Sequence, residues 1–348
     1  MLLACAGLLV VSCADGSGEA SSAANTAGSD GATFAAGAGS ESALPILTQM
    51  QGVLDVTAFR GVRRVIERQG GLSLEQLEDV GADGQGRFSI ELIDTISLPP
   101  DVDELSYPLL FESSARFQWT MRDFQVRDAA MAAQNYLVQT LPETPLVAGI
   151  GCVRLSVFRS ESIGDRPGHY RVDVDPNTGF VLAWSELDDS GAELARVQYE
   201  SFEYGGDLSD MILRGRSFEA SPLTLTLPLH GQVDFTPRFP ELLPGGMQVV
   251  SAEVQTVPAS LADAVTPGES SYLPVGDWLR MIATDGIEAI SFAHSSNVDT
   301  SAEAALGELR MVERGAWEIG FGRLDGTVFV VAARATLAEI ERIVSSAF

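Results

Sequence analysis

The sequence contains no lysine: its 22 basic residues are all arginines, set against 48 acidic residues, for a net charge of −26. Phosphate backbones and anionic lipid head groups are held by clustered cationic side chains. The longest arginine run here is the pair Arg63-Arg64. The composition therefore argues against nucleic-acid binding and against general docking on anionic lipids. It indicates partners that are neutral, apolar or basic.

Cysteine and histidine are also scarce, with three residues of each among 348. No two histidines have the spacing of metal ligands and no cysteine pair occurs, so the sequence predicts no metal site. Cys5 and Cys13 lie in or beside the N-terminal apolar run, which leaves Cys152 alone in the body of the chain and without a disulfide partner there. Because Cys152 stands in an apolar strand pattern, we interpret it as a core residue.

Catalytic motifs are missing as well: the sequence has no G-x-S-x-G elbow, no P-loop and no G-x-G-x-x-G following a strand. Residues 173–179 place acidic side chains at alternate positions, as calcium loops do. However, the glycine comes one place late, and Trp184 stands where a ligating Glu is needed. We interpret this segment as a hairpin turn, and we predict a non-enzyme without a cofactor.

Hydrophobic runs are short, and the first of them, residues 1–12, ends at Cys13. It is shorter than the ~20 residues of a membrane-spanning helix and is typical of a secretory signal. Because Val10-Val11-Ser12-Cys13 is similar to a bacterial lipoprotein box, we predict a lipoprotein signal peptide at residues 1–13, with Cys13 as the lipidated residue. A non-lipidated signal with an incidental Cys13 is the alternative.

Residues 14–44 are rich in small side chains, and 22 of the 30 residues from 14 to 43 are Ala, Gly or Ser. Such a segment cannot bury enough apolar surface to offset the entropy lost on ordering, so we predict a disordered tether. Behind a lipidated Cys13, this tether would let the body act at some distance from its membrane. The predicted location is the periplasm or cell envelope, with membrane contact through the lipid on Cys13.

Alternation of apolar and polar residues with a period of two dominates the rest of the chain and predicts β-strands. This pattern is found at Phe88–Leu92, Phe117–Met121, Val153–Val157 and Trp317–Phe321. Residues 170–204 contain three such runs separated by turn residues at 176–179 and 188–191, and they predict an antiparallel meander.

Helical signals are few. We predict helices at Pro45–Leu54, at Ala129–Leu137 and at the C-terminus, where Thr336–Glu339 form a capping box. Glycines and prolines between residues 205 and 232 mark a boundary. The body is thereby divided into two predicted domains, at residues 45–215 and 230–348.

Short segments of both predicted domains resemble the RseB/MucB family, in the right order over residues 45–348. In the first domain they are residues 147–155, residues 169–182 (HYRVDVDPNTGFVL) and residues 185–202. In the second domain they are Phe235, Leu243–Met247 (LPGGM), Asp285–Phe292 (DGIEAISF) and Val328–Val331. The lipoprotein carriers LolA and LolB are more distantly similar to the first domain.

The resemblance implies a mainly β (α+β) fold: a half-open antiparallel β-barrel of the LolA/RseB type packed on a helix, followed by a smaller α+β domain. It also implies an envelope-stress regulatory sensor. Such a protein binds the periplasmic part of a membrane anti-sigma factor and takes a lipid or lipoprotein acyl chain in an apolar cavity. The alternatives are a LolA/LolB-like carrier of lipid or lipoprotein, and an envelope lipoprotein with a structural interaction role.

A curved sheet with bulky apolar side chains on one face can make a concavity large enough for an acyl chain. We expect the cavity to be lined by members of the set Phe88, Phe117, Trp119, Leu155, Phe180 and Trp184. The alternative is that the same side chains fill the core.

Overall fold

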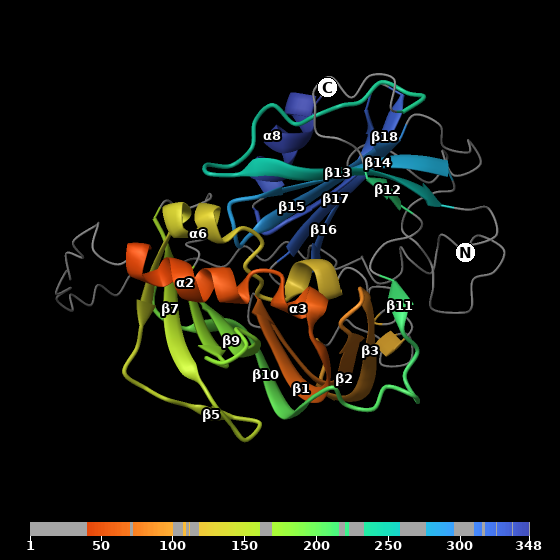
Figure 1. Ribbon diagram of the computed structural model, residues 1–348. Helices are drawn as coiled ribbons and strands as arrows, with labels where there is room; N and C mark the ends of the chain where they lie inside the picture. The colour runs from red at the N-terminus through yellow and green to blue at the C-terminus, as the bar shows by residue number, and fades with distance from the viewer. Residues whose placement is uncertain are drawn as a thin grey trace, which may run out of the picture.

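Two antiparallel sheets, one from each half of the chain, lie one above the other (Figure 1). The computed structural model describes residues 40–69, 72–99, 107–108, 111, 118–160, 169–215, 220–222, 233–257, 276–295, 310–314, 317–324, 326–335 and 337–347. The predicted signal peptide, Cys13 and Phe117 lie outside these ranges. Within them, no helix is long and apolar enough to cross a membrane. Below, residues 40–215 are called the N-terminal part and residues 220–347 the C-terminal part.

The N-terminal sheet has nine strands in the order β11-β3-β2-β1-β10-β9-β8-β7-β4, and all neighbouring pairs are antiparallel. The strands are β1 (Ala58–Gln69), β2 (Leu72–Asp83), β3 (Arg87–Ser97), β4 (Tyr136–Thr140), β7 (Val153–Arg159), β8 (His169–Val174), β9 (Val181–Leu187), β10 (Glu193–Tyr204) and β11 (Arg214–Gly215). Two short strands, β5 (Leu146–Val147) and β6 (Ile150–Gly151), form a separate hairpin. The edge strands β4 and β11 are not paired with each other among the described residues, so the sheet stays open. The predicted mainly β architecture with an unclosed antiparallel sheet is confirmed.

Strands β8, β9 and β10 form the predicted meander. Its first turn is closed by Asp175, whose Oδ1 accepts a hydrogen bond from the Asn177 backbone N–H at 2.9 Å. Gly179 completes the turn at φ 78°, and a Cβ there would come within 2.5 Å of the Gln49 carbonyl oxygen. The position therefore requires glycine both for its backbone conformation and for the close approach of the helix that carries Gln49. The acidic segment 173–179 is thus a strand end and a hairpin turn.

Three helices cover one face of this sheet: α2 (Ser40–Met50), α3 (Val53–Val56) and α6 (Ala129–Asn135) (Figure 1). The helix predicted at Pro45–Leu54 is interrupted at Gly52, which has φ 67°, and its first turn starts at Ser40. Helix α6 is capped by Asp128, whose side chain accepts from the Met131 N–H at 2.8 Å. Buried side chains of α2 and α6 pack on the sheet in one cluster that includes Leu47, Ala132, Leu155, Val172 and Trp184.

The strand predicted at Phe117–Met121 is wrong, because Gln118–Arg122 form one turn of π-helix, η1. The apolar alternation there has another cause. Trp119 packs with Phe59 and Phe88 of the N-terminal sheet, whereas Met121 packs with Ala289 of the C-terminal sheet. Residues two apart point to opposite sides of a helical turn as well as of a strand. Because Trp119 and Met121 are buried on opposite sides of this turn, the sequence shows the same alternation as a strand.

The C-terminal sheet has seven antiparallel strands in the order β12-β13-β14-β15-β18-β17-β16. The strands are β12 (Ala220–Pro222), β13 (Gln248–Val257), β14 (Gly276–Thr284), β15 (Ala289–Ser295), β16 (Arg310–Arg314), β17 (Trp317–Leu324) and β18 (Thr327–Ala333). The predicted C-terminal helix is confirmed as α8 (Leu337–Ala347), which buries Ile340, Ile343 and Val344 on the sheet. Thr336 of the capping box lies outside the described residues.

Candidate functional site: an apolar hollow with a polar end

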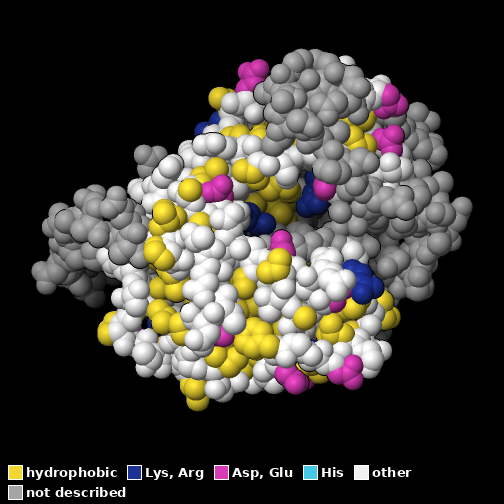
Figure 2. Space-filling model, in the orientation of Figure 1, with side chains coloured by type: hydrophobic (Ala, Val, Ile, Leu, Met, Phe, Trp, Pro, Cys, Tyr) yellow, Lys and Arg dark blue, Asp and Glu magenta, His cyan; other side chains and the backbone are white. Residues whose placement is uncertain are grey.

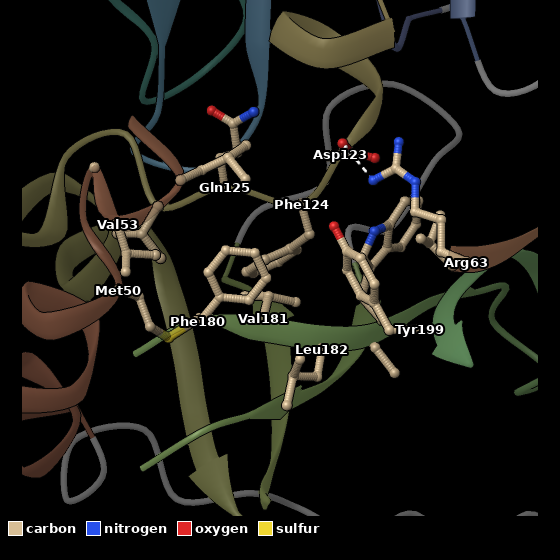
Figure 3. A pocket seen from close by; sticks show the side chains of 16 residues that line it. Met50, Val53, Arg63, Asp123, Phe124, Gln125, Phe180, Val181, Leu182 and Tyr199 are labelled. Atoms are coloured by element: carbon tan, nitrogen blue, oxygen red, sulfur yellow. Dashed lines mark hydrogen bonds and ion pairs between the residues drawn. The ribbon is translucent and has the colours of Figure 1, made fainter. Parts of the chain in front are cut away.

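A hollow opens in the N-terminal part between helices α2 and α3, residues 123–126, and strands β9 and β10 (Figure 3). It contains about 530 Å³ of space between atoms when its open mouth is included, of which about 40 Å³ admits the centre of a water molecule. Its walls are mostly apolar. They are formed by Met50, Gly52, Val53, Leu54, Arg63, Asp123, Phe124, Gln125, Val126, Phe180, Val181, Leu182, Ala183, Trp184, Val197 and Tyr199.

The two sides of the hollow differ in chemistry. Figure 3 shows Met50 and Val53 on one side, and Arg63, Asp123 and Tyr199 on the other. The surface of the N-terminal part also carries exposed hydrophobic side chains (Figure 2), among them Leu44 of α2 and Val56 of α3. An apolar chain could therefore enter from the side of the helices and reach a polar end.

The polar end is part of a buried ion network on strands β1 and β2. Arg63 donates from Nε to Glu78 Oε2 at 2.8 Å and from Nη1 to Asp123 Oδ2 at 2.9 Å. Arg122 donates from Nη1 and Nη2 to the two oxygens of Glu78, at 2.8 and 2.7 Å. Gln76 donates to Glu78 Oε1 at 2.5 Å and accepts from the Tyr107 hydroxyl. All four charged side chains are buried, and together they are electrically balanced.

The shifted pKa values of Glu78 and Arg63 keep both side chains charged near neutral pH. Burial alone would raise the pKa of the Glu78 carboxyl, but the charges of Arg122 and Arg63 and their hydrogen bonds lower it to about 2. For Arg63, burial opposes the charge, yet Asp123 and Glu78 hold its pKa above the ordinary value. Burial raises the pKa of the Tyr199 hydroxyl, which therefore stays protonated. Removing one charge would leave an uncompensated buried partner, which costs about 3–5 kcal/mol.

The structure distributes the predicted cavity residues over several places. Phe180 and Trp184 line the hollow. Phe88 and Trp119 stack on each other with ring centroids 4.6 Å apart, in the apolar cluster of β1, β2 and β3. Leu155 is fully buried in the cluster beneath α2 and α6. Phe117 lies outside the described residues.

Sequence reasoning missed the polar end, although the sequence contains a signal for it. Along β1 the buried face is formed by Phe59, Gly61, Arg63 and Val65, so a charged residue occupies a core position. Glu78 does the same on β2. A charge at a core position of a strand needs a buried partner, and the search for that partner would have led to the network.

The segment 122–128, called the linking segment below, connects the hollow to the C-terminal part. Residues 123–126 line the hollow. The next two backbone N–H groups, of Arg127 and Asp128, both donate to the carbonyl oxygen of Gly286, at 2.8 and 3.2 Å. At the other end, the carbonyl oxygen of Arg122 accepts from Arg334 Nη2 at 3.1 Å. The linking segment thus lines the hollow with its middle residues and bonds to the C-terminal part at both of its ends.

The turn between β14 and β15 inserts into the N-terminal part. Asp285 forms a buried ion pair with Arg159 of β7 and accepts a hydrogen bond from the Tyr136 hydroxyl at 3.0 Å. Its backbone carbonyl accepts from Asn135 Nδ2 at 2.8 Å. Gly286 follows with φ 109°, and a Cβ there would lie 2.2 Å from the Ala132 backbone nitrogen. The contact is therefore close-packed at the level of the backbone.

A second buried contact joins Arg334, the residue that follows β18, to the meander. Arg334 donates from Nη1 to Glu186 Oε2 at 2.8 Å and to the Tyr170 hydroxyl at 3.0 Å. Its guanidinium also lies over the ring of Trp184, 5.5 Å from the centroid. Because Trp184 lines the hollow, this contact is a second connection between the cavity wall and the C-terminal part.

No protein-family model matches the chain, and no curated protein matches its sequence. Solved structures with a similar fold include MucB, which is 16% identical over 88% of this chain and 97% of that chain, with a TM-score of 0.47. The Pseudomonas aeruginosa MucA/MucB complex aligns at 16% identity over 87% of this chain and 96% of that chain, with a TM-score of 0.44. A putative outer membrane lipoprotein-sorting protein domain from Vibrio parahaemolyticus aligns at 11% identity over 49% of this chain and 94% of that chain, with a TM-score of 0.22. At these identities the likeness concerns the fold alone.

Proposed function

We propose that the protein is an envelope-stress regulatory sensor of the RseB/MucB type. In this proposal the N-terminal hollow takes the acyl chain of a lipid or lipoprotein, and the body binds the periplasmic part of a membrane anti-sigma factor. The single observation that carries a sensor role is the linking segment, since its residues line the hollow and also bond to the C-terminal part. The anti-sigma factor as partner rests on the sequence resemblance over residues 45–348.

The closed hollow is too small for an acyl chain. Space of about 40 Å³ holds roughly three waters, since one water needs about 10–15 Å³ on this measure. Binding a chain therefore requires the walls to separate, and the walls that do not belong to the sheet include the end of α2, α3 and the linking segment. Burying a dozen methylenes would gain about 10 kcal/mol before the costs of binding and opening.

Opening of the hollow would change the contact between the linking segment and the C-terminal sheet. If Phe124 and Val126 move outward, the N–H groups of Arg127 and Asp128 must shift against Gly286, because the segment is continuous. A ligand that binds the open state more tightly shifts the equilibrium toward it by its difference in affinity. Occupancy of the cavity and the arrangement of the two parts are then thermodynamically linked, as a sensor needs.

The second candidate function is a LolA/LolB-like carrier. One observation favours it: the described residues that line the hollow all lie between positions 50 and 199, in the N-terminal part. A carrier would need only that part, and its ligand affinity would not depend on the contact at Gly286. An envelope lipoprotein with a structural interaction role would bind no chain at all.

Titration of the purified protein with tetradecanoate or a lysophospholipid, followed by tryptophan fluorescence, tests the proposal. We expect saturable binding with micromolar or tighter affinity. Val53→Phe fills the mouth of the hollow and should weaken binding at least about tenfold, a change of ~1.4 kcal/mol. Val56→Phe is the matched control, because Val56 lies on the same short helix but is 74% exposed. Absence of binding, or an equal effect of both variants, would overturn the cavity as the binding site.

A further inference from the structure

We infer that the hollow selects an apolar chain whose head is uncharged and both donates and accepts a hydrogen bond, as an acyl amide does. This inference rests on the proposed function in one respect, namely that an apolar chain enters the hollow. It goes further by assigning the chemistry of the head to Arg63 and Asp123 at the polar end.

The first support is a pair of buried polar atoms. Arg63 is 2% exposed and Asp123 is 8% exposed, and both line the hollow. Arg63 Nη2 and Asp123 Oδ1 have no hydrogen-bond partner within the described part of the chain. Their neighbouring atoms, Arg63 Nη1 and Asp123 Oδ2, are bonded to each other at 2.9 Å. An unpartnered donor and an unpartnered acceptor therefore belong to two adjacent, ion-paired residues of the cavity wall.

Further contacts of these two side chains are with Arg122, Glu78 and Tyr199, whose ring centroid lies 5.9 Å from the Arg63 guanidinium carbon. Asp123 Oδ1 lies 3.7 Å from Arg122 Nε, which is an ion pair beyond hydrogen-bond distance. Arg63 Nε donates a hydrogen bond to Glu78 Oε2 at 2.8 Å. Trp184 adds a third atom of this kind, because its buried Nε1 also has no hydrogen-bond partner among the described residues. Buried polar groups are normally bonded, so unpartnered ones lining a cavity indicate a ligand.

The second support is the balance of charge. The described charged side chains of the network are two guanidinium groups, Arg63 and Arg122, and two carboxylates, Glu78 and Asp123. An anionic head would lose its hydration, and its attraction to the two arginines would be offset by repulsion from the two carboxylates. A cationic head would also lose its hydration, and its attraction to the carboxylates would be offset by repulsion from the arginines. An amide avoids both costs. Its carbonyl accepts from Arg63 Nη2 and its N–H donates to Asp123 Oδ1, and no net charge is buried.

Four ligands with the same fourteen-carbon chain separate these possibilities on the wild-type protein near neutral pH. They are tetradecanamide, methyl tetradecanoate, tetradecanoate and tetradecylamine, each competing against one fluorescent fatty-acid reporter. We expect the amide to bind at least about tenfold more tightly than the ester, which cannot donate, and than either charged ligand. Equal affinities, or a preference for the anion, would overturn the inference while leaving the proposed cavity intact. If none of the four binds, the proposed function is overturned as well.

Asp123→Asn tests the assignment to named residues. The substitution keeps the shape and removes one negative charge beside Arg63, so the affinity ratio of amide to anion should fall at least about tenfold. Asp79→Asn is the control. Asp79 of β2 pairs with Arg60 of β1, neither residue lines the hollow, and the loss of the Asp79 charge should leave the ratio unchanged. An unchanged ratio in Asp123→Asn would contradict the assignment, and if that variant does not fold, the wild-type series decides alone.

Acyl amides could come from an acylated peptide or from an amide-linked lipid. N-tetradecanoylglycinamide represents the first source and N-tetradecanoylethanolamine the second. Both should bind more tightly than tetradecanoate, and the tighter of the two identifies the natural source. Weaker binding of both than of tetradecanoate would count against the acyl amide class.

Discussion

The substitution Gly286→Ala should separate the two parts of the protein. The new Cβ would lie 2.2 Å from the Ala132 backbone nitrogen, whereas ordinary van der Waals contact begins near 3.4 Å. Because the obstructing atoms belong to backbone, no rotation of a side chain can relieve the overlap. The turn between β14 and β15 must therefore withdraw from α6 by more than an ångström.

The cost can be worked out from the contacts that such a withdrawal breaks. Gly286 O accepts from the Arg127 and Asp128 N–H groups at 2.8 and 3.2 Å, and Asp285 O accepts from Asn135 at 2.8 Å. Each hydrogen bond contributes about 1 kcal/mol to stability. We therefore expect a loss of roughly 2–4 kcal/mol in addition to the backbone strain of alanine at positive φ, which is about 1–2 kcal/mol.

Gly326→Ala is the matched control for the strain. Gly326 has φ 77° in the turn between β17 and β18, and a Cβ there meets nothing within 4 Å. Equilibrium unfolding in urea, followed by circular dichroism and tryptophan fluorescence, gives the free energies. We expect one transition for wild type and Gly326→Ala, and two transitions for Gly286→Ala. The reasoning is refuted if Gly286→Ala unfolds in a single transition within about 0.5 kcal/mol of the control.

Three further outcomes are expected. Burial lowers the pKa of His294 from 6.5 to about 4. The contribution of His294 to the free energy of unfolding is therefore fully present above pH 6.5 and is lost, by about 3 kcal/mol, as the pH drops toward 4. His294→Gln should remove that part of the pH dependence in acid unfolding, and an unaltered dependence of the unfolding free energy on pH would contradict it. Cys13→Ala should move the protein from the membrane to the soluble fraction, and a wild type that already fractionates as soluble would disprove the lipid anchor. Limited proteolysis should cut between residues 215 and 230, yield two fragments that still co-elute on gel filtration, and separate them in Gly286→Ala; first cleavage within residues 170–204 would contradict the domain division.

The strands and their local turns could be predicted from the sequence because their signals are local. Period-two alternation located β3, β7, β17 and the meander, and turn residues at 176–179 located its first hairpin. Partner strands carry no such signal. Strand β1 pairs with β10, placing Phe59 opposite Tyr204, and nothing in the composition of either strand specifies this pairing.

The polar end of the hollow and the contact between the two parts were not predicted, for two physical reasons. The core positions of Arg63 and Glu78 become clear only once the burial of their strand face is known, and their partners Asp123 and Arg122 lie 60 and 44 residues further along the chain. The DGIEAISF segment predicts only a strand motif, and its first residue is Asp285. Its ion pair with Arg159 depends on how two sheets pack, which no local pattern encodes.

Hydrogen exchange at the linking segment tests the sensor account most directly. The amides of Arg127 and Asp128 donate to Gly286 O, so their exchange rates report whether the segment stays against the C-terminal part. Saturating the hollow with tetradecanamide should speed exchange of both amides at least about tenfold, a change of ~1.4 kcal/mol. The amide of Val331, in the paired strand β18, should be unaffected. Saturable binding with unchanged exchange at Arg127 and Asp128 would contradict the account.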